Sequence, residues 1–597
     1  MLNKLALNGI KHRARDYSVL FSGLMIAAAI FYMFMALATN QSFLKSNSPA
    51  SATVFIFGFG IVLLAIITIV YINYANTFLL SMRQKEYGMF MMLGAKSSKI
   101  SQMIFIETLS IGAIATLIGS AIGIFLTGFV GKWLISALDM QIKHFDSFYL
   151  PAFLWTLAFF VIIFAFSAIR NAISLRRSKV LTLLNRDSQP VKIKRNGVVK
   201  AVQAVLGLIL LAVGYLTMYF VGQQPGFIYL GIPLALITIV GGTYFTINSL
   251  VTFVIVALKR NIKYSQKGLN NFTLSQLSFR INDYTKILSM VSIMFALALG
   301  AITVGLGFNN QIDNVVNGQS YYDVQVTNPD AAQQKRIRGL QIDKENVYTY
   351  KTDAKNVYYQ ASEFKKQPLG YSKINTETMV SKHATSSDPS KNDNANFALM
   401  NTRLPAQRTK NTKLLSDQEY AAIKSPETKT VLVKTNSFKG NLNQIKAISK
   451  AENQRYPELK TAGGDKYSSY TMINGFFSGL EFMGLFLGIA FLAMLASCLM
   501  FKILSGASGD VKRYNMLYKV GTRQKMLRQT INKEIAVLFS VPAILGLIHV
   551  LVGLQLFSKI LYQPYSHIEI PFMIFIVLYL IYYFVTRYLY KKIVLKN

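Results

Sequence analysis

The sequence predicts a polytopic α-helical membrane protein with ten transmembrane helices and one α+β extracytoplasmic domain inserted between helices 7 and 8. Of its 597 residues, 52% are hydrophobic and 15% are charged. The apolar residues gather into runs near or above the roughly 20 residues that a spanning helix needs. One long polar stretch, residues 309–472, interrupts these runs. Lys and Arg are concentrated in alternate connecting segments, as in proteins that cross a membrane many times.

Ten runs have the length and composition of membrane spans. They lie at Tyr17–Leu37, Val54–Leu80, Met103–Val130, Pro151–Ile169, Ala201–Val221, Phe227–Leu258, Ile287–Phe308, Ile473–Phe501, Ile535–Phe557 and Pro571–Val585.

The charge distribution predicts the topology. With the N- and C-termini in the cytoplasm, the inner segments hold 35 Lys and Arg, whereas the short outer loops hold four. This is the positive-inside pattern of plasma-membrane proteins. The net charge of +36 is therefore better explained by anionic membrane lipids than by nucleic acid, which we exclude as a partner.

The polar stretch 309–472 is expected outside the membrane as an α+β domain. Residues 321–326 and 431–433 are rich in β-branched and aromatic residues and predict strands. Ser416 precedes Glu419 by three residues, which predicts a capping box at the start of a short helix. Residues 381–396 contain few apolar side chains and predict a mobile loop. The single cysteine, Cys498, lies in the eighth span, so this domain folds without disulfides.

A short amphipathic segment occurs twice, at residues 85–94 and, 427 positions later, at 512–521. Each copy follows a span on the predicted cytoplasmic side. A motor that moves both halves of a membrane protein needs such a pair of contact points, so we expect ATPase-coupling residues here. They are Lys85, Glu86, Tyr87, Gly88, Leu93 and Gly94 in the first copy and Lys512, Arg513, Tyr514, Leu517 and Gly521 in the second.

The repeat extends beyond this motif. The same offset pairs Glu107 with Glu534, and an offset of 267 pairs Arg13 with Arg280, so spans one to three and seven to nine are predicted to be equivalent units. The expected division of the chain is a first unit at 1–135, the fourth span and a basic linker at 136–200, spans five and six at 201–268, a leading helix and the seventh span at 269–308, the extracytoplasmic domain at 309–472, and the rest of the second unit at 473–597.

Three carboxylates fall at or inside the spans, where a charge is costly and a function is the first hypothesis. For Glu107 and Glu534 we expect structural ion pairs, with Lys99 and Lys533 as the nearby cations. Glu481 lies nearer the outside and is expected to hydrogen-bond between helices or to contact substrate. Gly-x-x-x-Gly spacings at Gly119/Gly123, Gly475/Gly479 and Gly484/Gly488 predict close helix packing.

The chain has no catalytic signature. It contains no phosphate-binding Gly-x-x-x-x-Gly-Lys-Ser/Thr loop and no Gly-x-Gly-x-x-Gly after a strand, so nucleotide hydrolysis would need another chain. The five histidines are scattered singly, without the spacing of a metal site. We therefore expect a non-catalytic membrane subunit without metal or cofactor, with ATP bound by a partner.

These residues resemble the FtsX-like permeases of ABC transporters, and within them the ten-span branch that confers resistance to bacitracin and other antimicrobial peptides. The resemblance is carried by residues 83–88 with Leu93 and Gly94, and by 242–245, 275–277, 484–488 and 586–588. It implies a cytoplasmic ABC ATPase dimer, mechanotransmission to the outer domain, and a peptide antibiotic or lipid-pyrophosphate target. It also implies sensing through a membrane histidine kinase. In the second motif Arg513 replaces Glu86 and Asn515 replaces Gly88, so the two docking surfaces need not be equivalent.

Three other functions remain open at this point. A permease that releases lipoproteins or regulates wall hydrolases is less favoured, because those relatives mostly have four spans. An ion-coupled secondary transporter would have broken helices near the bilayer midplane, whereas long uninterrupted spans are predicted here. An enzyme acting on lipids would need an acid, base or nucleophile set that is not apparent.

Overall fold

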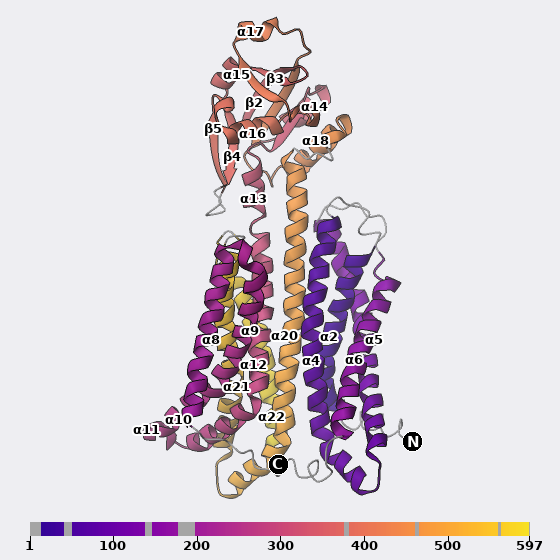
Figure 1. The fold of residues 1–597 in the computed structure, drawn as a ribbon, viewed down its shortest axis with the longest axis vertical. Coiled ribbons are helices and arrows are strands. Elements are labelled where there is room, and N and C mark those ends of the chain that lie inside the picture. Colours follow the sequence, from indigo (N-terminus) through magenta and orange to yellow (C-terminus); the bar gives the residue numbers. More distant parts are fainter. Residues whose placement is uncertain are drawn as a thin grey trace. The chain divides into compact units, whose positions relative to one another are not determined.

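A computed structural model describes residues 14–40, 50–137, 146–176, 197–374, 381–459, 465–558, 561 and 563–595. Among these residues, ten helices are long and apolar enough to cross a membrane, which confirms the predicted fold class. The chain forms two compact units, a membrane unit and an α+β unit made mainly of residues 307–478 (Figure 1). Residues 177–196 of the predicted basic linker lie outside the described part of the chain.

The first half of the membrane unit is a bundle of four helices. They are α2 (Ala14–Thr39), α4 (Ala50–Met92), α5 (Ser97–Ala137) and α6 (Leu150–Arg176). Helix α2 contacts the other three. A Cβ at Gly119 or Gly123 of α5 would lie 2.7 Å from a backbone oxygen of α2, so the predicted Gly-x-x-x-Gly packing is confirmed at this position.

The second half contains the remaining spans. Their elements are α8 (Gly197–Gln223), η1 (Pro225–Phe227), α9 (Ile228–Thr246), a π-helical turn η2 (Ile247–Val251), α10 (Thr252–Arg260), α11 (Ile262–Ser265), α12 (Asn270–Asn309), α20 (Lys466–Lys519), α21 (Gln524–Gly553), η5 (Leu554–Phe557) and α22 (Glu569–Val594). Gly484 and Gly488 of α20 face Ala301 and Ala298 of α12 so closely that a Cβ at either glycine would meet a carbonyl oxygen. The spacing of Gly484 and Gly488 thus also serves close packing.

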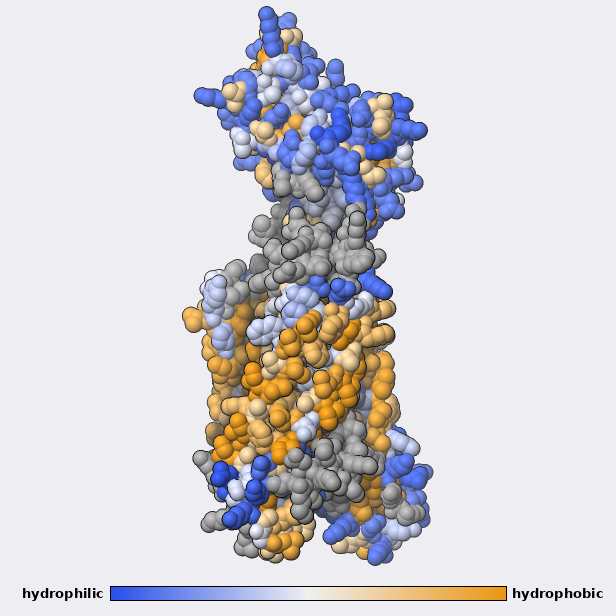
Figure 2. Space-filling model, turned by 90° about the vertical axis from the view of Figure 1, so that its right-hand side faces the viewer, coloured by the Kyte–Doolittle hydropathy of each residue, from blue (hydrophilic) through white to orange (hydrophobic). Residues whose placement is uncertain are grey.

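One continuous core joins the two halves of the membrane unit. The Tyr71 hydroxyl of α4 and the Ser497 hydroxyl of α20 share a buried hydrogen bond of 2.9 Å. The outer surface is apolar: Phe125, Phe129, Trp155 and Ile162 of α5 and α6 are each more than 60% exposed. Figure 2 shows a hydrophobic band on this unit, with hydrophilic residues gathered at its lower end. Such a surface is stable in the hydrocarbon of a bilayer.

The α+β unit is built on a five-stranded sheet. Its strands are β1 (Val324–Thr327), β2 (Ile342–Thr352), β3 (Asn356–Gln360), β6 (Asn411–Leu415) and β7 (Thr428–Thr435), in the order β1-β7-β2-β3-β6. In this sheet β3 and β6 pair in parallel, and the other described pairs are antiparallel. A separate hairpin joins β4 (Leu369–Ile374) and β5 (Ser381–Ser386). The strands predicted at 321–326 and 431–433 correspond to β1 and β7.

Short helices pack against the sheet and the hairpin. They are α13 (Ile312–Gln319), α14 (Ala331–Arg338), α15 (Ala361–Lys366), η3 (Pro389–Lys391), α16 (Asp393–Asn401), η4 (Pro405–Gln407), α17 (Asp417–Ala422) and α18 (Leu442–Arg455). The capping box of Ser416 and Glu419 at the start of α17 is confirmed.

The prediction of a mobile loop at residues 381–396 is wrong. This segment forms β5, η3 and the start of α16. Strand β5 is stabilised by backbone pairing with β4, which needs no apolar side chains. Helix α16 begins with an N-cap, the Asn392 side chain accepting from the Ala395 N–H, and buries Ala395 and Leu399. These contacts cannot be predicted from amino-acid composition alone.

Candidate functional site

Both copies of the repeated motif lie where a membrane helix continues beyond its span. Helix α4 extends from Thr77, the end of its apolar window, to Met92, and α20 extends from Ala507 to Lys519. At 1.5 Å per residue these extensions reach about 22 and 18 Å past the windows. Both end at the lower end of the membrane unit in Figure 1, where the chain turns back into α5 and α21.

The two turns have the same backbone geometry. Gly94 and Gly521 have φ angles of +91° and +96°, a region that favours glycine. In the first turn the Gly94 N–H donates to the Met91 oxygen at 3.1 Å and the Ala95 N–H to the Phe90 oxygen at 2.9 Å. The second turn repeats these bonds 427 residues later, at 3.0 and 3.1 Å. Each helix therefore ends in a Schellman motif that satisfies its last carbonyls.

Each turn carries exposed apolar side chains, and we call them the first tip and the second tip. The first tip consists of Met89, Phe90, Met92 and Leu93, and the second of Met516, Tyr518 and Val520. Leu93 and Val520, which occupy equivalent positions, are 84% and 81% exposed. Apolar side chains that project beyond a membrane span without cover are typical of protein contact surfaces.

The tyrosine at the third position of each motif, by contrast, is buried. Tyr87 and Tyr514 are each 2% exposed. The Arg83 guanidinium lies over the Tyr87 ring, 5.1 Å from its centre. The Tyr514 hydroxyl donates to Glu534 Oε1 at 3.2 Å, and burial raises the pKa of Tyr514, which keeps it a proton donor. These two residues position the tips and do not form their outer surface.

An ion pair anchors the first tip. Arg83 of α4 pairs with Glu107 of α5, and its Nε lies 3.1 Å from Glu86 Oε2. Arg83 and Glu107 are both buried. The ion pair expected for Glu107 is confirmed, but the expected partner was wrong: Lys99 is exposed, and Arg83, two residues before the motif, reaches the carboxylate instead.

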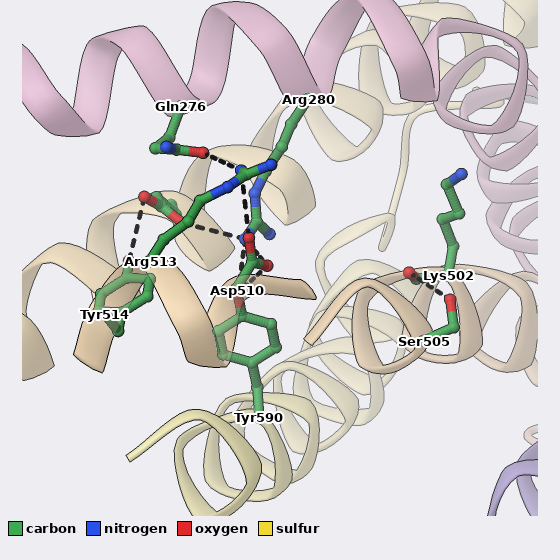
Figure 3. Close-up of polar contacts among 9 residues, drawn as sticks. Gln276, Arg280, Lys502, Ser505, Asp510, Arg513, Tyr514 and Tyr590 are labelled. Atoms are coloured by element: carbon green, nitrogen blue, oxygen red, sulfur yellow. Dashed lines mark hydrogen bonds and ion pairs between the residues drawn. The ribbon is translucent and has the colours of Figure 1, made fainter. Parts of the chain in front are cut away.

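A larger cluster anchors the second tip (Figure 3). The Arg280 guanidinium of α12 lies 2.5 Å from Asp510 Oδ2 on α20 and 3.4 Å from Glu534 Oε2 on α21. It also donates to the Tyr590 hydroxyl of α22 at 2.5 Å, and that hydroxyl donates to Asp510 at 2.7 Å. All four side chains are buried. One arginine thus joins four helices at the base of the tip.

Arg280, not Lys533, is the cation beside Glu534. Lys533 Nζ donates to Asn270 Oδ1 at 2.7 Å. Sequence reasoning missed Asp510 and Tyr590 as members of the cluster. The repeat offset could have indicated Asp510, because it lies 427 residues after Arg83, just as Glu534 does after Glu107.

The remaining motif residues fall into three groups. Lys512, Arg513 and the two glycines of the turns are exposed, Glu86 and Leu517 are half-buried, and Gly88 is buried. Arg513 donates to Gln276 at 2.9 Å and lies 3.4 Å from Asp510, so it ties the second tip to α12. The side chain of Lys85 lies outside the described part of the structure.

Glu481 lies apart from both anchors. It is half-buried on α20, and its carbonyl oxygen would lie 3.0 Å from a Cβ at Gly305 of α12. Its backbone thus belongs to the close contact between these helices. Within the described ranges, no group of His, Cys, Asp or Glu is arranged to hold a metal ion.

Comparison with known proteins matches residues 56–178, which include α5, α6 and most of α4, to the family described as FtsX-like permease C-terminal. Three proteins of Bacillus subtilis strain 168 align over nearly the whole chain, each at 22% identity. The ABC transporter permease YvcS aligns over 100% of both chains, and the ABC transporter permease YxdM and the bacitracin export permease BceB over 99% of both. The resemblance to FtsX-like ABC transporter permeases of the bacitracin-resistance branch is thereby confirmed.

Proposed function

We propose that this chain, which is similar over its full length to FtsX-like ABC transporter permeases, couples a separate cytoplasmic ATPase dimer to its α+β domain. The observation that supports this most directly is the pair of tips. They have the same backbone turn, expose apolar residues at equivalent positions, and are separated by the repeat offset. An ATPase dimer presents two equivalent surfaces, and each of them would bind one of the two tips.

The anchors under the tips support a mechanical role. A contact made at Leu93 or Val520 is followed, inward along the chain, by a buried tyrosine and then by a buried ion pair. Packed cores transmit displacement because they are dense and stiff. A force on the second tip would reach α12, α21 and α22 through Arg280, whereas a force on the first tip would reach α5 through Arg83.

The orientation follows from the charge distribution. The segments on the side of the tips are rich in Lys and Arg, which in short loops favours the cytoplasm. The tips would then face a cytoplasmic ATPase, both chain termini would be cytoplasmic, and the α+β domain would be extracytoplasmic. That domain carries an excess of basic residues, which suits an anionic lipid-pyrophosphate or wall polymer better than a cationic peptide.

The role in resistance to, and sensing of, cell-wall-targeting peptide antibiotics is proposed by analogy. One relative is named a bacitracin export permease, and a shared fold does not by itself transfer a substrate. A membrane sensor histidine kinase is the further partner that this analogy implies.

The test is an affinity purification of the tagged chain from gently solubilised membranes, with bound proteins identified by mass spectrometry and ATPase activity measured in the eluate. We expect an ABC ATPase with the wild-type chain and its loss from the double variant Leu93→Glu/Val520→Glu. Phe397→Glu is the matched control, because Phe397 is 67% exposed on the α+β domain. If the double variant recovers as much ATPase as the wild-type chain, the tips are not the docking surface. If no ATPase is recovered with the wild-type chain, the proposal that it is a transporter subunit is overturned.

A further inference from the structure

The sixth span is longer than the membrane requires. The apolar window containing α9, η2 and α10 runs for 32 residues, from Tyr229 to Arg260. At 1.5 Å per residue this is about 48 Å, against about 30 Å of hydrocarbon. A span of this length reaches past the hydrocarbon, and Lys259 and Arg260 in its last turn favour the headgroup region for this end. We call residues 252–268, which contain α10, α11 and the following turn, the elbow.

The elbow changes direction at a defined residue. Asn261, with φ −73° and ψ 100°, ends α10, and its side chain accepts from the Tyr264 N–H to start α11. Figure 1 shows α10 and α11 projecting sideways at the lower end of the membrane unit. The Asn270 amide donates to the Tyr264 oxygen at 2.9 Å, and Lys533 of α21 donates to Asn270 at 2.7 Å. The elbow is thus fixed to the rest of the unit.

Apolar side chains of the elbow are uncovered. Phe253 and Ile262 are 69% and 66% exposed. Four further side chains are also exposed, to a smaller extent: Val254, Val256, Leu258 and Tyr264. Only Ile255 and Ser265 of the two helices are buried. A helix with this much uncovered apolar surface at the level of the headgroups is typical of interfacial membrane segments.

The same elbow is strongly basic. Lys259, Arg260, Lys263 and Lys267 are all exposed, and residues 247–282 contain no Asp or Glu. Lys259 Nζ donates to the Ser275 hydroxyl at 2.9 Å. Within the part of the chain that the structure describes, none of these four cations forms an ion pair with a carboxylate. Four neighbouring cations without counter-charge, beside exposed apolar residues, complement an anionic lipid in both its headgroup and its acyl chains.

We propose that the elbow is a binding site for anionic phospholipids. Lys259, Arg260, Lys263 and Lys267 bind the headgroup phosphates, and Phe253 and Ile262 pack against the first carbons of the acyl chains. The inference stands apart from the proposed ATPase partner, because it concerns this chain and its lipid alone.

The test uses the purified full-length chain in a mild detergent. Native mass spectrometry measures its binding of phosphatidylglycerol and of phosphatidylcholine with identical acyl chains. The elbow variant carries Lys259→Gln, Arg260→Gln, Lys263→Gln and Lys267→Gln. The control variant, Lys335→Gln, Arg336→Gln, Arg338→Gln and Lys365→Gln, removes the same number of exposed charges from α14 and α15 of the α+β unit.

We expect the preference for phosphatidylglycerol to fall about tenfold or more in the elbow variant, since each cation contributes to headgroup attraction. The control variant should keep the wild-type preference. Raising the salt from 50 to 500 mM should weaken the preference of the wild-type chain and have little effect on that of the elbow variant. An elbow variant that keeps the wild-type preference, a control that loses it equally, or a wild-type chain that binds both lipids alike would each overturn the proposal.

Discussion

Arg83 on α4 and Asp510 on α20 occupy equivalent positions of the two repeats, 427 residues apart, and carry opposite charges. Each lies beside an equivalent buried glutamate, Glu107 or Glu534. In the first repeat the arginine and the glutamate neutralise each other. In the second, two carboxylates meet, and the cation comes from Arg280 on α12. The same turn is therefore anchored by two helices in one half and by four in the other.

This arrangement predicts that Arg280 is a major stabilising residue of the membrane unit. Arg280→Gln removes the cation beside the buried Glu534 and leaves Asp510 with only the partly exposed Arg513, 3.4 Å away. Removing one partner of a buried ion pair costs about 3–5 kcal/mol. We expect a loss of that order in the free energy of unfolding, measured as a lower midpoint of thermal unfolding of the solubilised chain.

Two further variants separate charge from packing. Adding Asp510→Asn to Arg280→Gln removes one of the two buried carboxylate charges and should restore part of the lost stability. Asp283→Asn is the control, because Asp283 is 44% exposed where it pairs with Lys502, and exposed pairs contribute about 1 kcal/mol or less. Equal effects of Arg280→Gln and Asp283→Asn would refute the role of the cluster.

The positive φ of Gly521 makes a second prediction. Gly521→Ala places a Cβ in the left-handed region and should destabilise the second tip by about 1–2 kcal/mol. Hydrogen exchange should rise at the Thr522 N–H, which donates to the Leu517 oxygen across the turn. The Gly509→Ala control, in a helix interior with open space around the glycine, should be neutral or slightly stabilising. Unchanged exchange at Thr522 would contradict the expected strain.

The sequence predicted the features that depend on local patterns. The ten spans follow from apolar length, and the capping box from the spacing of Ser416 and Glu419. The two carboxylates were correctly expected to be paired, but the nearest lysines in the sequence were the wrong partners. Arg280 precedes Glu534 by 254 residues, and only the packing of α12 against α20 and α21 brings the charges together. The strand β5 was missed because its stability comes from backbone pairing with β4.

In the α+β unit, Arg403 makes a third prediction. Its side chain is fully buried. It donates to the Tyr359 hydroxyl at 3.1 Å, the Lys410 oxygen at 3.1 Å and the Thr412 hydroxyl at 2.6 Å, which joins β3 to β6. Arg403→Met removes the donor from the buried Tyr359 hydroxyl and from the half-buried Lys410 and Thr412 oxygens, and a buried polar group left without a partner costs about 1–3 kcal/mol.

We therefore expect faster hydrogen exchange along β6 in the full-length chain carrying Arg403→Met, corresponding to a loss of several kcal/mol in local stability. Lys413→Met, which removes an exposed cation from the same strand, should leave the exchange unchanged. Slow exchange in both variants would mean that β6 does not depend on the Arg403 contacts.

The hairpin of β4 and β5 gives a prediction about pH. Partial burial, and then the nearby cations Lys434 and Lys466, lower the pKa of His383 on β5. Its Nδ1 lies 3.0 Å from the Ser372 hydroxyl of β4. The folded chain then binds a proton at His383 more weakly than the unfolded chain does. The stability that this group contributes is present above the ordinary histidine pKa of about 6.5 and is lost as the pH falls toward the pKa of the folded chain.

Calorimetry of the full-length chain should show a lower unfolding midpoint of the α+β unit at pH 5 than at pH 7.5, and His383→Gln should reduce this difference. A variant with the full wild-type difference would show that other groups cause it.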